Sequence, residues 1–255
     1  MDRWALIIAT LLAAIGGVNG MLSVHHGHRS KATLFWMIGT LAGQLVFLYL
    51  RGQERGACPL MGSGEVLVFL AWSLTIFYLL VGSGYRLSLL GVFTAPVVVA
   101  FQGIALLPGV LEPNPQRVPG TDAWRETHAA MSVLGYGALA LAAVAAVMFL
   151  VLNKQLKDHH LASGLFKNLP PVRELLVSLR RLLWVGWVTL SVGVVAGFRM
   201  PRGEGAGGHL IAAAVVWVAY AVLLGVLQFR GMTGRRLSLL TVVLFVFSLS
   251  VFAWV

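Results

Sequence analysis

Eight stretches of about twenty mostly apolar residues recur along this chain of 255 residues. A helix of about 20 apolar residues is long enough to cross the hydrocarbon core of a bilayer. Hydrophobic residues make up 58% of the chain and charged residues only 11%, whereas a soluble domain carries about 25% charged residues. We therefore expect an all-α, polytopic transmembrane helical bundle of about eight helices, formed as a single integral membrane domain over residues 1–255. The expected spans are 4–24, 31–50, 63–82, 87–107, 128–152, 178–198, 209–229 and 237–255.

Two connections between the expected spans are longer than short turns. The segment from Pro108 to Thr127 carries four prolines, which exclude a regular helix until Thr121-Asp122 can cap the fifth span. The segment from Asn153 to Val177 is basic and contains Pro170-Pro171 ahead of an amphipathic stretch, Val172 to Arg181. The first span is expected to be a retained helix, because it lacks a small-residue cleavage site.

The distribution of positive charge predicts the orientation in the membrane. The net charge is +10, but the basic residues stand in short stretches between apolar runs, so no nucleic-acid partner is expected. The side that holds the N-terminus carries seven of the 19 Lys and Arg residues, Arg51 and Arg55 among them, and the other side carries twelve. Positive loops stay in the cytoplasm. We therefore expect a multi-pass protein of a bacterial-type inner (plasma) membrane, in contact with lipid, with both termini on the outer (periplasmic) side.

Pairs of glycines four residues apart stand in three of the spans. They are Gly16 and Gly20, Gly39 and Gly43, and Gly193 and Gly197. This spacing lets helix backbones approach closely in lipid, where packing drives association. The alternative for each pair is the ordinary glycine content of membrane helices.

Glu65 is a carboxylate in the first turn of the third span, with Phe69 and Trp72 on the same helical face. A charged group inside the bilayer is costly unless it is paired or near an interface. One interpretation places Glu65 at headgroup level, where the positive helix N-terminus favours it. The other is a carboxylate that holds a ligand loop or a partner helix.

Two histidines open spans on the expected outer side. His128 begins the fifth span, with Tyr136 about two turns along, and His209 begins the seventh. A neutral imidazole is a good axial ligand for haem iron, so His128 is a candidate haem ligand and His209 a weaker second one. The alternative is a histidine that is merely solvated or hydrogen-bonded at the interface.

The remaining residues point away from catalysis by the polypeptide. His25, His26 and His28 form a short tract without a neighbouring carboxylate or cysteine, which suits an interfacial flank better than a metal site. Cys58 is the one cysteine, so no intrachain disulfide or cysteine cluster can form. The sequence carries no phosphate-binding loop, zinc-protease pattern or nucleophile elbow. We therefore expect no enzyme, and no metal beyond possible haem iron at His128.

A series of motifs resembles the cytochrome c assembly family, the CcsA-type and HemX-type group of haem-handling membrane proteins. The resemblance spans about residues 55 to 245 and follows the family's order. Its motifs are Cys58-Pro59-Leu60 followed by Glu65, Phe69 and Trp72; Leu90 to Pro96; Thr127-His128 with Gly135-Tyr136-Gly137; Leu169-Pro170; Gly186 to Gly197; and Trp217 to Tyr220 with Gly234-Arg235-Arg236.

The resemblance implies a role in cytochrome c biogenesis, in which haem is held at the outer membrane face for attachment to apocytochrome c, with partner subunits of the assembly machinery. It matches His128 to an outer haem-ligating histidine, and Glu65 and Trp72 to supporting positions of the third span. The chain departs from haem-delivering members between spans six and seven, because Phe198 to His209 contains no tryptophan. The haem loop is thus degenerate or missing, which resembles the HemX-like branch.

Two alternatives to haem handling stay open. One is a HemX-like membrane regulator of haem biosynthesis that acts through the basic segment from Lys154 to Arg181. The other is a small-solute transporter, which the scarcity of polar residues in the middle of the spans disfavours.

Overall fold

The computed structural model describes residues 2–26, 32–85, 88–118, 120, 122–157, 172–200 and 206–250. These residues form eight α-helices and no β-strand, which confirms the predicted all-α bundle. The helices are α1 (Asp2–His25), α2 (Ala32–Arg55), α3 (Ser63–Tyr85), α4 (Ser88–Ala105), α5 (Ala123–Lys157), α6 (Val172–Arg199), α7 (Ala206–Phe229) and α8 (Gly234–Ser248).

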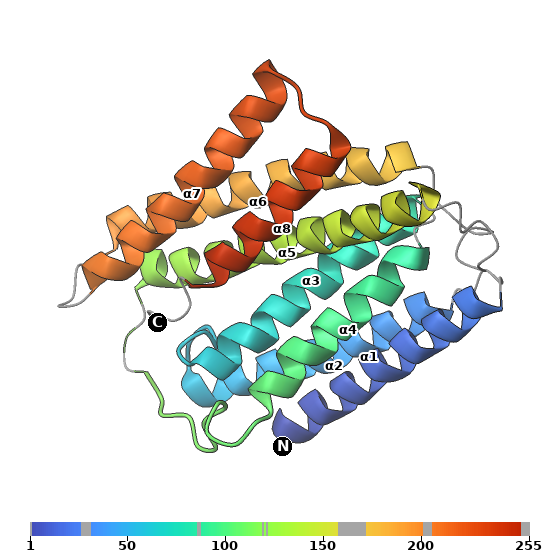
Figure 1. Cartoon of the computed structure of the whole chain (residues 1–255). Coiled ribbons are helices and arrows are strands. Elements are labelled where there is room, and N and C mark those ends of the chain that lie inside the picture. Colours follow the sequence, from blue (N-terminus) through green and yellow to red (C-terminus); the bar gives the residue numbers. More distant parts are fainter. Residues whose placement is uncertain are drawn as a thin grey trace.

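Successive helices run in alternating directions along the bundle (Figure 1). As a result, α1, α3, α5 and α7 begin at the same end at which α2, α4, α6 and α8 finish. His128 lies in the second turn of α5, so this end is called the His128 end below. The turn between α7 and α8 lies at the opposite end.

The central element is α5, which is 35 residues long and packs against α3, α4, α6 and α8. Its stretch from Ala138 to Ala146 is buried and consists mainly of alanine, so neighbouring helices can approach its backbone closely. At Gly137 a Cβ atom would overlap Ser73 of α3, and at Gly135 it would lie 2.9 Å from the backbone nitrogen of Leu190 in α6. Small residues on α5 therefore hold the two halves of the bundle together.

The glycine pairs lie at helix contacts, as the packing interpretation predicted. A Cβ atom at Gly16 or Gly43 would meet a side chain of the facing helix in the α1–α2 pair at 2.8 or 2.9 Å. At Gly193 a Cβ atom would lie 2.5 Å from Oγ of Ser132, and at Gly197 it would lie 2.7 Å from Nδ1 of His128. The last pair therefore sets the α5–α6 contact at the His128 end.

Within the described residues, six helices are long and apolar enough to cross a membrane, namely α1, α2, α3, α5, α6 and α7. The chain is thus a multi-pass membrane protein. The other two helices are shorter: the apolar stretch of α4 covers Leu89–Ala105, and α8 has 15 residues. The predicted last span, 237–255, includes residues 251–255, which lie outside the described residues.

Three helices extend beyond the predicted spans by about a turn or more, at four of their ends. Helix α2 continues past residue 50 to Arg55, because its last turn is stabilised by buried ion pairs rather than by lipid. Helix α5 begins at Ala123 and runs to Lys157, beyond the predicted 128–152. In α6 the amphipathic stretch and the sixth span form one continuous helix from Val172.

The expected cap of the fifth span is present at Asp122. Its Oδ2 accepts a hydrogen bond from the backbone N–H of Arg125 at 3.3 Å, which satisfies a donor in the first turn of α5. Thr121 lies outside the described residues, as do residues 158–171 with Pro170-Pro171. Half of the segment from Lys154 to Arg181, to which the alternative regulatory role was assigned, therefore lies outside the described residues.

Candidate functional site

His128 is held between α5 and α6 at the His128 end. Its side chain is 7% exposed, and its Nδ1 lies 2.7 Å from the carbonyl oxygen of Gly193 in α6. Because Gly197 has no side chain, α6 can approach the ring this closely. The glycine pair on α6 thus creates the space for the imidazole and supplies its acceptor.

The hydrogen bond to Gly193 fixes the tautomer of His128. A carbonyl oxygen only accepts hydrogen bonds, so Nδ1 carries the hydrogen, and in the neutral ring Nε2 then carries the lone pair. A backbone acceptor on one ring nitrogen is the usual support of a histidine that binds metal through the other. The imidazole of His128 is therefore held in the way that suits a residue that would bind a metal.

An apolar groove lies beside this contact, between the end of α6 and the start of α7. It has a volume of about 360 Å³ and is lined by Phe198, Leu210, Ile211, Ala214, Val215 and Val218. Leu210 links the groove to His128, because both residues would contact a Cβ atom placed on Gly197, at 2.8 and 2.7 Å. The histidine and the groove are thus neighbouring features of one end of the bundle.

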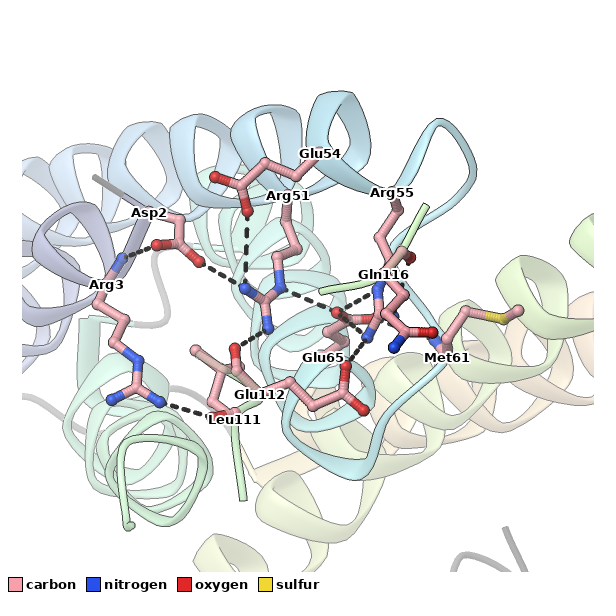
Figure 2. Close-up of polar contacts among 10 residues, drawn as sticks. All are labelled: Asp2, Arg3, Arg51, Glu54, Arg55, Met61, Glu65, Leu111, Glu112 and Gln116. Carbon is pink, nitrogen blue, oxygen red and sulfur yellow. Dashed lines mark hydrogen bonds and ion pairs between the residues drawn. The ribbon is translucent and has the colours of Figure 1, made fainter. Parts of the chain in front are cut away.

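A second feature of the His128 end is a buried ion-pair network centred on Arg51 and Glu65 (Figure 2). Nε of Arg51 lies 2.9 Å from Oε1 of Glu65, and Nη1 lies 2.9 Å from Oδ2 of Asp2. The side chain of Arg51 is fully buried and that of Glu65 is 2% exposed. Because both charges are desolvated, their direct pairing is required for either to be tolerated.

Arg55, one turn after Arg51, extends the network to the connection before α5. Its Nε and Nη2 lie 3.0 and 2.8 Å from the same Glu65 oxygen, and Nη2 lies 2.8 Å from Oε2 of Glu112. The second Glu65 oxygen accepts the backbone N–H of Met61 at 3.0 Å. Glu65 thus ties two arginines of α2 to the start of its own helix.

The network also fixes the proline-containing connection after α4. Arg51 donates to the carbonyl oxygen of Glu112, Arg55 donates to that of Gln116, and Arg3 donates to that of Leu111 at 2.6 Å. The backbone N–H of Val118 donates in turn to the carbonyl oxygen of Arg55 at 3.0 Å. Arginine side chains therefore replace the hydrogen bonds that this irregular backbone cannot make to itself.

Cys58 connects the network to α5. Its backbone N–H donates to Oε1 of Glu126 at 3.2 Å, two residues before His128. Burial first, and then the carboxylates of Glu126 and Glu65, together raise the pKa of the Cys58 thiol from 9.0 to about 11. The thiol is therefore protonated at neutral pH and unsuited to nucleophilic chemistry or metal binding.

The structure distinguishes the two interpretations of Glu65. The side chain is buried and bound to α2, so the carboxylate holds a partner helix. Trp72 is half-buried, and its ring is tilted by 57° to that of Phe69, with ring centroids 5.0 Å apart. Its Nε1 has no hydrogen-bond partner among the described residues. That Glu65 and Trp72 support a bound cofactor stays a prediction.

The other candidate histidines are separate from this site or are not described in full. His209 lies in the first turn of α7, but its side chain is not among those described. His25 and His26 lie at the opposite end with ring centroids 5.6 Å apart, and His28 falls outside the described residues. In the described part of the chain, no group of three His, Cys, Asp or Glu residues could hold a metal ion.

The sequence prediction missed the partners of Glu65. The sequence pattern assigns Asp2 no role, and the charge count includes Arg51 and Arg55 only as positive charges of the outer side. One signal was available: the two arginines stand four residues apart directly after an apolar run, which places them on one face of a continuing helix.

Comparison with known proteins adds the family context. The family described as "Cytochrome C assembly protein" matches residues 61–253. A "Cytochrome c biogenesis protein CcsA" of Synechococcus sp. strain CC9605 is 27% identical over 247 residues, which cover 84% of this chain and 81% of that protein. The protein of the same name from Synechococcus sp. strain CC9902 is 28% identical over 233 residues, 80% of this chain and 75% of that protein.

Matches of higher identity are shorter. The protein of this name from Nostoc punctiforme is 32% identical over 122 residues, which cover 45% of this chain and 35% of the relative. The chain thus aligns with only about a third of the length of that relative.

Proposed function

Because the chain belongs to the cytochrome c assembly family, we propose that it works in cytochrome c biogenesis by holding or staging haem at the His128 end. The single observation that carries this proposal is the hydrogen bond from Nδ1 of His128 to the carbonyl oxygen of Gly193, which holds the imidazole in one orientation and one tautomer at this end of the bundle. The printed name of the relatives, cytochrome c biogenesis protein, supports the same process.

The residues around His128 fit haem as a substrate of this end. The imidazole of His128 would hold haem through its iron, since histidine is a common protein ligand of haem iron. Phe198 and Leu210 offer apolar surface next to the histidine, suited to a macrocycle that is itself apolar. The buried network of Arg51 and Glu65 holds the connection between α4 and α5 in place, so the residues near His128 are rigidly positioned.

The proposal also assigns an orientation and partners. The charge count favours an orientation with the His128 end on the outer (periplasmic) side of the inner membrane. Apocytochrome c, the acceptor of haem in this process, would then meet the protein at that end, together with partner subunits of the assembly machinery.

The test is the absorption spectrum of the full chain, purified in detergent from haem-replete cells. We expect a haem Soret band that is lost in His128→Gly and restored when imidazole is added to that variant, since free imidazole can occupy the ligand position. His26→Ala is the matched control, because His26 is an exposed histidine at the opposite end. A haem-free wild-type protein would contradict the proposal, and so would a Soret band unchanged by His128→Gly.

Gly197 offers a second test that leaves the histidine in place. Gly197→Ala puts a methyl group 2.7 Å from Nδ1 of His128, so the ring must move and the Soret band should shift or weaken. Gly225→Ala is the control, because a Cβ atom there meets nothing within 4 Å. Equal spectra for the two variants would show that the α6 contact does not position the ligand.

A further inference from the structure

The turn between α7 and α8 forms a recess at the end opposite His128. This recess has a volume of about 880 Å³ and is lined mainly by Val226, Arg230, Thr233, Arg236, Leu239 and Leu240. The turn itself is tight, because Gly231 adopts a φ of +69° and reverses the chain directly after α7. Figure 1 shows the turn projecting at the tip of the α7–α8 pair, away from α1 to α4.

Positive charge converges on this recess, and none of the residues that line it is acidic. Arg230 and Arg236 are both exposed, and neither forms an ion pair or side-chain hydrogen bond with a described residue. Arg236 and its neighbour Arg235 stand in the first turn of α8, where the helix dipole disfavours cations. Thr233 leaves the first turn of α8 without a side-chain cap. The recess therefore presents to an anion two arginines that have no ion-pair partner among the described residues.

The remaining walls of the recess are apolar. Val226 on α7 and Leu239 and Leu240 on α8 are exposed large hydrophobic residues that lie on the membrane side of the arginines. A small soluble anion would contact the arginines, but it has no apolar part that could contact these walls. A ligand that combines an anionic group with hydrocarbon chains would satisfy both parts of the recess.

We propose that the recess between α7 and α8 binds an anionic phospholipid, with the headgroup phosphate between Arg230 and Arg236 and an acyl chain along Val226 and Leu240. Guanidinium groups form bidentate hydrogen bonds with phosphate oxygens, which gives the site its anchor. A general excess of positive charge on this side requires arginines in the loops, but it does not require two of them to line one recess above an apolar wall.

The test is native mass spectrometry of the full chain in detergent, mixed with equal amounts of phosphatidylglycerol and phosphatidylcholine. We expect wild-type protein to retain phosphatidylglycerol preferentially. The variant Arg230→Gln/Arg236→Gln should lose that preference by a factor on the order of ten, since each arginine near a lipid surface contributes. Arg230→Lys/Arg236→Lys should keep most of it, which separates the loss of charge from misfolding.

Two further arms make the result specific. Arg173→Gln/Arg180→Gln removes the same charge from exposed positions of α6 outside the recess, and it should leave the lipid preference unchanged. Inorganic phosphate at millimolar concentration should not displace the retained lipid, because it cannot fill the apolar wall. The proposal is overturned if the two glutamine variants behave alike, if phosphatidylcholine is retained equally, or if free phosphate displaces the lipid.

Discussion

Replacing Glu65 by glutamine tests whether the buried network stabilises the His128 end. The substitution keeps the shape of the side chain but removes the charge that Arg51 and Arg55 share. Arg51, which is fully buried, would keep Asp2 and the carbonyl oxygen of Glu112 as acceptors. Arg55 would keep Glu112, whose side chain is 57% exposed. The variant therefore weakens the contacts of Glu65 with Arg51 and Arg55, while each arginine keeps at least one other hydrogen-bond acceptor.

The expected loss follows from the contacts of Glu65. A hydrogen bond to a charged group contributes about 1.5–3 kcal/mol, and Glu65 accepts from both arginines. The glutamine oxygen can still accept one of these bonds. We therefore expect the free energy of unfolding to fall by about 3 kcal/mol, the lower end of the roughly 3–5 kcal/mol found when one partner of a buried ion pair is removed.

Glu54 provides a matched control, because it also faces Arg51. Its carboxylate is 3.8 Å from Nη1 of Arg51 and 47% exposed, so Glu54→Gln should cost less than about 1 kcal/mol. Both variants can be compared by reversible unfolding in mixed micelles, with tryptophan fluorescence and far-ultraviolet circular dichroism as probes. Losses that agree within about 1 kcal/mol would refute the view that burial makes the Glu65 contacts important.

Three further predictions concern packing, thiol reactivity and orientation. Gly137→Ala should destabilise the protein by about 1–3 kcal/mol in the same unfolding assay, because the added methyl group overlaps Ser73, whereas Gly103→Ala should be neutral or stabilising, since its Cβ atom meets nothing within 4 Å. Alkylation of Cys58 near pH 8 should be roughly 100-fold slower than that of a thiol with a pKa of 9.0, and its rate should rise about tenfold per pH unit up to about pH 11. At a fixed pH the rate should be higher in Glu126→Gln, because this substitution removes a carboxylate that raises the pKa of the thiol. An alkylation rate that does not change with pH would contradict this prediction. A periplasmic reporter enzyme fused to either terminus should be active in cells, and activity of a cytoplasmic reporter at either terminus would overturn the proposed orientation.

The sequence predicted the helices well because their cause is local. A segment inside a bilayer must satisfy its own backbone hydrogen bonds, so a run of about 20 apolar residues is enough to indicate a helix. The contacts of Gly16 and Gly43 followed from the same reasoning, since spacing along one helix determines which residues share a face. The cap at Asp122 was also local, because its partner stands three residues away.

The ion-pair network could not be predicted in this way, because its partners are far apart in the sequence. Arg51 pairs with Asp2, 49 residues earlier, and donates to Glu112, 61 residues later. An arginine at the end of an apolar run has the same local pattern whether it faces water or a buried carboxylate. His128 is a similar case, because the sequence places it early in a helix but does not reveal its acceptor on Gly193, 65 residues away.

The arginine contacts to the connection between α4 and α5 have a consequence for recognition at the His128 end. A segment without its own helix or strand would ordinarily lose conformational freedom when a partner binds, and that loss would weaken binding. Here Arg3, Arg51 and Arg55 fix its carbonyl groups during folding. Any molecule that binds to this connection therefore meets a surface that is already ordered. Its affinity depends on the contacts it makes and is not reduced by the entropy cost of ordering the loop.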